Sequence, residues 1–472
     1  MLNRNKTLLL LAIMLVITLY SYFHVSYTPL SKQKLAIALF FTLITLSIYA
    51  FSKERTFYLK SNYFKISTIF VIGYVLVHFF EYLAYVVGAH DKIIDIEYVD
   101  SKYINEAAFF SCACLAVYFM GYVFEMKPFK SQKSYKSNSI FLEFFMLICL
   151  VIFYFSAGSY YFNGGYGDVL NNIGLSLPAI LSQTSLQASQ VAIAMIVVYN
   201  RQKKLSVIDY IKQFSFIYYF TLLLYSYLVM SSGDRGPLFQ AGICYITPYF
   251  LINKIKLKPI PAAILISVSA LFFALLGTVR AMDGGLSVEK FEKAQEFRSQ
   301  RFEGESIVFT STAELSNVVR AYHVLYDFTR EHGTIYGLGL GNQLLGIIPG
   351  LRLLIYPLFG IDDKEVTTAV VTTNLLDKDH GMGSTCVGDT LFNFGIWGTL
   401  PIFFLFGMFV RKMDLSSYEN INCLNPFWCC TIITYFMFAI YIGRGYLTSP
   451  INLLAYSWFF FLLNYKFCKT HV

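Results

Sequence analysis

Two arginines at the ends of apolar segments are the side chains best suited to chemistry in this chain. Arg235 lies in the polar segment Ser231–Gly236 between two apolar runs, and Arg280 ends the apolar run Ile260–Val279. A charge at the end of a membrane span is costly unless it meets water, a partner or an anionic ligand. Since a guanidinium can hold a diphosphate with two parallel hydrogen bonds, the pair indicates a shared anion site. The alternatives are a turn in which Asp234 pairs with Arg235, and an Arg280 that snorkels to the interface.

Further candidates lie in a long polar stretch, residues 282–385. Thr312–Arg330 is predicted to form an amphipathic helix, and its apolar face would hold Leu315, Val318, Val319, Tyr322, Leu325 and Tyr326. Arg320 and His323 are three positions apart and therefore share one side of that helix. Arg352 follows a glycine-rich segment. Each of these charges is a candidate ligand for an anion, and each is otherwise an ordinary solvated charge.

Acid–base candidates gather where the long stretch ends. The segment Asp377–Asp389 contains Asp379, His380 and Asp389 and leads directly into the next apolar run. Its glycines allow a ligand to approach the backbone closely, and a His or Asp there could take a proton from a sugar hydroxyl. The alternative is a capping segment for the helix that follows.

Polar residues also recur inside two apolar runs. One run carries Gln183, Gln187 and Gln190 with Ser182, Ser185 and Ser189, and the other carries His78, Glu81, Tyr82 and Tyr85 on one face. Polar groups within the bilayer must face protein or water. They therefore indicate either a polar groove or hydrogen bonds between helices.

The elements that must position these residues are membrane helices. Hydrophobic residues make up 56 % of the 472 residues and charged residues only 14 %, well below the charged fraction of soluble domains. Windows close to the 20 apolar residues that a span needs occur at 8–27, 35–51, 66–87, 107–124, 140–156, 178–199, 214–230, 237–252, 260–280, 386–410, 426–442 and 448–465. We predict an all-α polytopic membrane protein with about 12 transmembrane helices and one large external loop that contains short helices.

Lysine and arginine in the short loops set the orientation. With both termini inside, the inside segments hold most of the basic residues, as the positive-inside rule requires. The chain then divides into N-terminal spans at 1–281, an external loop at 282–385 and C-terminal spans at 386–472. The glycine- and proline-rich stretch Tyr336–Gly360 is predicted to be a broken amphipathic or re-entrant element on the outer face, because those residues disfavour a straight helix.

No motif indicates a metal or an organic cofactor. The nine cysteines lie in spans, at a span edge or in inside segments, and their spacing relative to histidines does not match a zinc site. The net charge of +8 follows from the membrane topology and does not indicate nucleic-acid binding.

The layout and several short motifs together resemble the Wzy-type O-antigen (oligosaccharide repeat unit) polymerases of bacteria. The resemblance rests on Arg235-Gly236 at an outer hairpin, on the large external loop, and on Gly383-Ser384-Thr385, Gly388-Asp389, Asn393-Phe394-Gly395 and Gly398. It implies an inner-membrane glycosyltransferase with its active face in the periplasm and both termini in the cytoplasm. It further implies transfer of a growing glycan from undecaprenyl diphosphate onto a lipid-linked repeat unit, with membrane lipids and a chain-length regulator as partners.

The resemblance also implies roles for particular residues. Arg235, Arg280 and Arg352 would bind the diphosphate, and Asp389 is the acidic residue before Asn-Phe-Gly. His380 and His323 compete for the role of a loop histidine found in related ligases. An O-antigen ligase, which transfers the glycan to the lipid A core, is the nearest alternative. A repeat-unit flippase would be expected to show two related halves, and a passive assembly protein is a further alternative.

Overall fold

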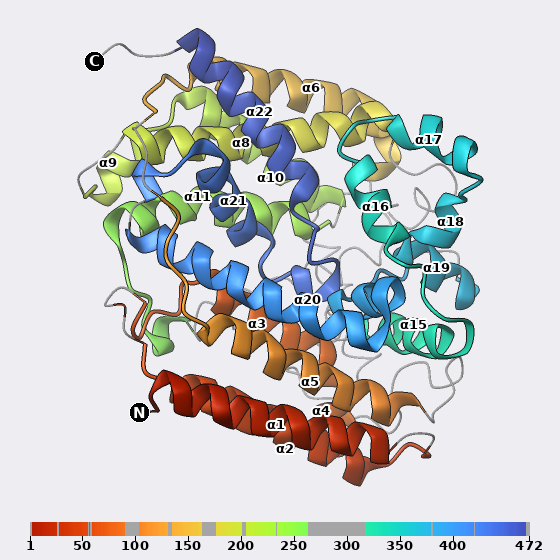
Figure 1. The fold of residues 1–472 in the computed structure, drawn as a ribbon. Coiled ribbons are helices and arrows are strands. Elements are labelled where there is room, and N and C mark those ends of the chain that lie inside the picture. Colours follow the sequence, from red (N-terminus) through yellow and green to blue (C-terminus); the bar gives the residue numbers. More distant parts are fainter. Residues whose placement is uncertain are drawn as a thin grey trace.

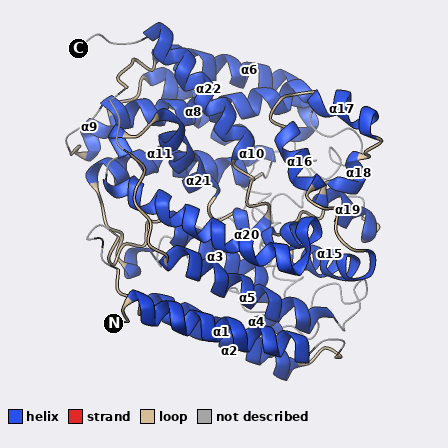
Figure 2. Ribbon diagram, in the orientation of Figure 1, coloured by secondary structure: helices blue, strands red, loops and turns tan. Residues whose placement is uncertain are grey.

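The computed structural model describes residues 2–25, 28–54, 56, 59–89, 103–130, 135–162, 176–200, 204–232, 234–262, 317–378, 381–419 and 421–468. The described chain consists of helices and the loops that join them (Figure 2), apart from an isolated bridge between Leu2 and Ser52. Arg280, His380 and most of the predicted span 260–280 lie outside the described residues. All other predicted windows coincide with described helices.

The described helices are bounded as follows: α1 Arg4–His24, α2 Lys32–Ala50, α3 Ile66–His78, α4 Phe80–Val86, α5 Ile104–Val123, α6 Ile140–Phe162, α8 Leu177–Asn200, α9 Val207–Ile211, α10 Phe216–Ser232, α11 Gly236–Asn253, α15 Val319–His332, α16 Leu338–Leu345, α17 Leu351–Phe359, α18 Asp363–Val366, α19 Thr368–Leu375, α20 Cys386–Glu419, α21 Pro426–Phe438 and α22 Ile451–Cys468. Among them, six are long and apolar enough to cross a bilayer, or seven if the bent pair α3–α4 is one span.

The predicted span 66–87 is not one straight helix. It bends by 46° between α3 and α4, because Phe79 leaves the helical conformation with φ −130° and ψ −17°. On the two sides of this bend, His78 and Glu81 are both fully buried. The bend therefore turns two polar side chains toward protein instead of lipid.

Helix α20 is the longest described helix and packs against α5 through reciprocal glycine contacts. A Cβ atom on Gly121 would lie 2.0 Å from the carbonyl oxygen of Phe404, and one on Gly407 would lie 2.1 Å from that of Tyr118. Small residues at such crossings let two membrane helices approach until their backbones touch. The non-helical backbone of Gly395, with φ +67°, then kinks α20 near its N-terminal end.

The glutamine stripe on α8 joins helices together. Gln183 and Gln187 donate to the Tyr225 hydroxyl over 3.3 and 3.4 Å, and Gln190 donates to the Ala241 carbonyl over 2.9 Å. These contacts link α8 to α10 and α11, so the interhelical explanation accounts for the stripe.

The helices α15–α19 of the predicted external loop lie at one end of the bundle, and both termini lie at the other (Figure 1). The predicted amphipathic helix is confirmed over its described part as α15, with Val319, Tyr322, Leu325 and Tyr326 all buried. The stretch Tyr336–Gly360 is broken, as predicted, into α16 and α17.

Candidate functional site

The glycine-rich start of α16 docks on the Asn393-Phe394-Gly395 kink of α20. The Gly337 amide donates to the Asn393 carbonyl over 3.0 Å, and the Leu340 amide donates to the Asn393 side-chain oxygen over 3.3 Å. A Cβ atom on Gly339 would come within 2.8 Å of the Asn393 side chain. Glycine is therefore needed at Gly339, and the Asn-Phe-Gly run serves to fix α16 against α20.

Asp389 lies in the first turn of α20, directly before this docking point. The residue is buried, with 8 % of its surface exposed. It accepts hydrogen bonds from the Thr368 hydroxyl over 3.0 Å and from the Asn393 side-chain amide over 3.3 Å. Gln343 of α16 is a further hydrogen-bonding neighbour. A buried carboxylate is costly unless it is hydrogen-bonded in this way. The donors come from three helices, α16, α19 and α20 itself.

A cavity of about 70 Å³ lies next to Thr368, the hydrogen-bonding partner of Asp389. Its wall is formed by Gly339, Asn342, Gln343, Arg352, Val366, Thr367, Thr368 and Tyr446. Such a volume holds a few water molecules. Thr368 both lines the cavity and donates to Asp389, so its hydroxyl connects the cavity to the buried carboxylate.

Tyr446 joins Arg352 and Asp389 electrostatically across this cavity. Its hydroxyl is within hydrogen-bonding reach of Thr368 and lies in the fields of both Asp389 and Arg352. Burial raises the pKa of Tyr446 above its usual value. Thr448, two residues later, donates to the Gln343 side chain. The connection between α21 and α22 therefore forms part of the cavity wall and contacts α16.

The same connection approaches the hairpin that carries Arg235. Arg235 precedes α11 and is partly exposed, and Pro237 lies in the first turn of that helix. Tyr441 lies in the electrostatic field of Arg444, Arg235 and Asp234. Two arginines from separate hairpins thus lie near one tyrosine. The α21–α22 connection therefore runs from Tyr441, near Arg235 and Arg444, to Tyr446 in the cavity wall.

His323 lies away from this cavity. It is 1 % exposed, and its Nε2 is 2.7 Å from the Tyr82 hydroxyl of α4. Burial, together with the neighbouring His78, lowers the pKa of His323 to about 3. An imidazole that is this weakly basic is a poor proton acceptor at neutral pH. In this conformation His323 serves packing between α15 and α4.

The structure brings together two of the predicted residues, Asp389 and Arg352. Arg235 lies near Arg444, and Arg320 lies half-buried in the first turn of α15. Arg280 and His380 lie outside the described residues. Among the residues that are described, no three His, Cys, Asp or Glu side chains are placed to hold a metal ion.

Sequence reasoning missed the residues that complete the site, which are Gln343, Thr368, Arg444 and Tyr446. The segment Gly443-Arg444-Gly445-Tyr446 is a short polar connection between two apolar runs, as is the segment that contains Arg235. Applying the same criterion to both would have found Arg444. Nothing in the sequence indicated Gln343 or Thr368, because neither residue type is unusual in a loop helix.

One of three comparisons with known proteins identifies a family. No curated protein and no solved structure matches the chain. The family described as O-antigen polysaccharide polymerase Wzy matches residues 7–472, which is nearly the whole chain. The match includes the spans, the external helices and every residue of the candidate site. The chain therefore belongs to the Wzy family of O-antigen polysaccharide polymerases.

Proposed function

We propose that this protein extends O-antigen by transferring a growing glycan from undecaprenyl diphosphate onto a lipid-linked repeat unit. The proposed site is at the end of the bundle where α15–α19 lie, which would face the periplasm of the inner membrane. The observation that carries the proposal is the cavity in which Arg352, Gln343, Thr368 and Tyr446 converge beside the buried Asp389. Family membership supports the polymerase over the ligase and the flippase.

In the proposed reaction, the acceptor sugar hydroxyl attacks the anomeric carbon of the donor. A new glycosidic C–O bond forms, and the C–O bond to the diphosphate breaks. The electron pair leaves with the undecaprenyl diphosphate, and the proton leaves with a base. The leaving group gains charge as the bond breaks, so cationic donors placed there lower the barrier without requiring a metal.

Asp389 is the proposed base, acting through Thr368. The Thr368 hydroxyl lies in the cavity wall and already donates to Asp389 over 3.0 Å. As the acceptor hydroxyl loses its proton to the Thr368 oxygen, Thr368 passes its own proton to Asp389. His380 remains a predicted alternative base. His323 is the weaker candidate, because burial suppresses its basicity.

The arginines are proposed to bind the diphosphate. Arg352 lines the cavity, and Arg235 and Arg444 flank Tyr441 at the other end of the α21–α22 connection. Arg280 and Arg320 remain predicted ligands. A cavity of about 70 Å³ is below the roughly 300 Å³ of ligand pockets, so the cavity must widen to admit a sugar diphosphate.

The function is tested with a strain that lacks the protein. Glycan limited to one repeat unit on the lipid A core supports a polymerase. Free lipid-linked polymer would assign the ligase role instead, and loss of all surface glycan would assign the flippase role. Reporter fusions within residues 317–378 should report a periplasmic location. A cytosolic location would overturn the proposal, because the site and its sugar would be on opposite sides of the membrane.

The site is tested by complementing this strain with variants expressed at equal levels. Arg352→Ala should shorten the ladder to one or a few repeats, and Arg352→Lys should restore it only in part, since lysine cannot bind a diphosphate with two parallel bonds. The matched control is Lys364→Ala, which removes an exposed charge from the same group of helices. Ladders of normal length from Arg352→Ala would remove Arg352 from the site.

A further inference from the structure

A second cavity, lined by lysines and aromatic rings, lies at the other end of the bundle, and nothing in the proposed reaction uses it. Its volume is about 500 Å³, and its wall includes Lys127, Lys130 and Lys412 around Phe129 and Trp428. We propose that this cavity binds the phosphate head group of an anionic membrane lipid. The proposal does not depend on which sugar the protein transfers.

Two stacked aromatic rings form part of the wall of this cavity, which we call the lysine cavity. The rings of Phe129 and Trp428 stack with centroids 3.9 Å apart and planes 12° apart. The Phe129 amide donates to the Ser416 hydroxyl over 2.8 Å, which ties the connection after α5 to α20. The Lys412 ammonium lies 4.6 Å from the centre of the Phe129 ring, within the range of a cation–π contact. Lys412 thus lies over the Phe129 ring and lines the cavity.

The three positive charges lack a counter-charge in the part of the chain that the structure describes. None of the three lysines forms an ion pair with a described carboxylate. The nearby carboxylates are already engaged, since Glu54 accepts from Arg411 over 3.0 Å and Glu125 accepts from Arg4. Like charges gathered in one cavity repel each other, and one bound phosphate would relieve that repulsion.

Helix α21 adds to the positive potential. It begins at Pro426, and Asn425, the residue that caps it, forms part of the cavity wall. The positive end of the helix dipole is therefore directed to the cavity and favours an anion there.

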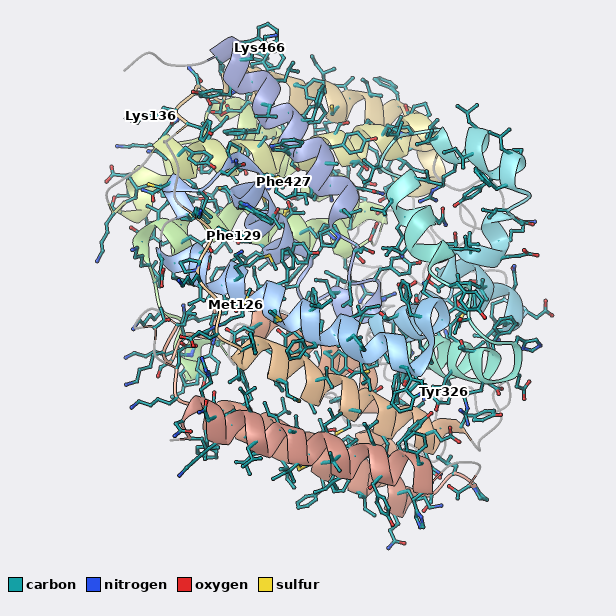
Figure 3. All side chains as sticks on the ribbon, viewed as in Figure 1. Met126, Phe129, Lys136, Tyr326, Phe427 and Lys466 are labelled. Carbon is teal, nitrogen blue, oxygen red and sulfur yellow. The ribbon has the colours of Figure 1, made fainter. Side chains whose placement is uncertain are left out.

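The position of the cavity along the helices favours a lipid over a free anion. Lys412 follows Asp389 by 23 residues on α20, which is at most roughly 35 Å at 1.5 Å per residue. That length is close to the thickness of the hydrocarbon core, about 30 Å. The cavity therefore lies at head-group level on the face opposite the candidate site, and Figure 3 shows Met126 and Phe129 at the opposite end of the bundle from Tyr326.

The two segments that supply the lysines also carry exposed apolar side chains, which could contact acyl chains. Phe124, two residues before the cavity, is 45 % exposed, and Leu405 of α20 is 61 % exposed. Basic pockets between membrane helices, next to apolar surface, are the sites that bind anionic head groups in membrane proteins. The volume of about 500 Å³ lies within the range of ligand pockets.

The test uses the full-length protein in nanodiscs of neutral phosphatidylcholine, to which phosphatidylglycerol is added. Native mass spectrometry should show lipid retained on the wild-type protein, and thermal stability should rise with the fraction of phosphatidylglycerol. Replacing all three lysines by glutamine should weaken retention at least about tenfold. If that protein does not fold, Lys127→Glu with Lys130→Glu replaces it, since both side chains are exposed.

The matched control replaces three exposed lysines at the same end of the bundle by glutamine: Lys6, Lys53 and Lys60. This variant has the same net charge and should retain lipid as the wild type does. Equal losses in both triple variants would overturn the proposal, because bulk charge would then explain the binding. Stabilisation by inorganic phosphate alone, without retained lipid, would overturn the lipid assignment and make the site one for a free anion.

Discussion

Replacing Thr368 tests the proposed proton path most directly. Its hydroxyl lines the cavity and donates to Asp389 over 3.0 Å. Thr368→Val keeps the shape of the side chain and removes only the hydroxyl. Thr368→Ser keeps the hydroxyl and removes only a methyl group. The two variants therefore separate the contribution of the hydrogen bond from that of packing.

The expected size of the effect follows from the contact. A hydrogen bond to a charged, buried acceptor contributes about 1.5–3 kcal/mol. At about 1.4 kcal/mol per factor of ten, losing this stabilisation disfavours the ionised form of Asp389, which is the active base, by roughly 10- to 100-fold relative to its protonated form. Loss of the relay adds to this figure, because general base catalysis contributes roughly 10²–10⁴-fold. Thr368→Ser should stay within a few-fold of the wild type.

The assay measures the initial rate of polymer formation from purified lipid-linked repeat units by the purified protein. Melting temperature in the same detergent serves as the folding control. A Thr368→Val protein with the wild-type rate would refute the relay. A Thr368→Ser protein as slow as Thr368→Val would assign the effect to packing of the methyl group.

Three further outcomes are expected. Arg235→Ala and Arg444→Ala should each shorten the glycan ladder, because both arginines lie near Tyr441; normal ladders from both would remove the second half of the diphosphate site. Gly407→Ala should lower stability by about 1–3 kcal/mol, because its Cβ would lie 2.1 Å from a backbone carbonyl of α5, whereas Gly341→Ala, with nothing within 4 Å, should not. Burial lowers the pKa of His323 to about 3, so acid favours the unfolded state, which gains a proton below its ordinary value of 6.5. The contribution of His323 to stability should therefore be complete above pH 6.5 and fall by about 1.4 kcal/mol at pH 5.5, and melting curves of His323→Gln should lack this part of the pH dependence.

The helical membrane class of this protein could be predicted from the sequence, because it depends on local composition. A run of about 20 apolar residues can only satisfy its backbone in a bilayer as a helix. The glycines and prolines between Tyr336 and Gly360 likewise break a helix wherever they occur, and α16 and α17 are separated there. Neither inference requires knowledge of the contacts between helices.

Candidate residues could be named from the sequence, but which of them lie close together in space could not be predicted. The acidic residue before Asn-Phe-Gly and the arginine after the glycine-rich segment were both predicted. Their meeting across Tyr446 depends on α16, α19 and the α21–α22 connection, which are far apart in the chain. The bend in α3–α4 could not be predicted either, since residues 66–87 contain no proline and the break occurs at Phe79, an ordinary helix residue.

The residue type determines which reactions a side chain can take part in, but the fold determines its basicity and its neighbours. His323 and Asp389 appeared equivalent as candidate bases along the chain. Only the packing of α15 on α4 makes His323 a poor base, and only the docking of α16 and α19 on α20 surrounds Asp389 with donors. Desolvation and hydrogen bonding act through space between segments that are remote in the chain, so residue order alone does not contain them.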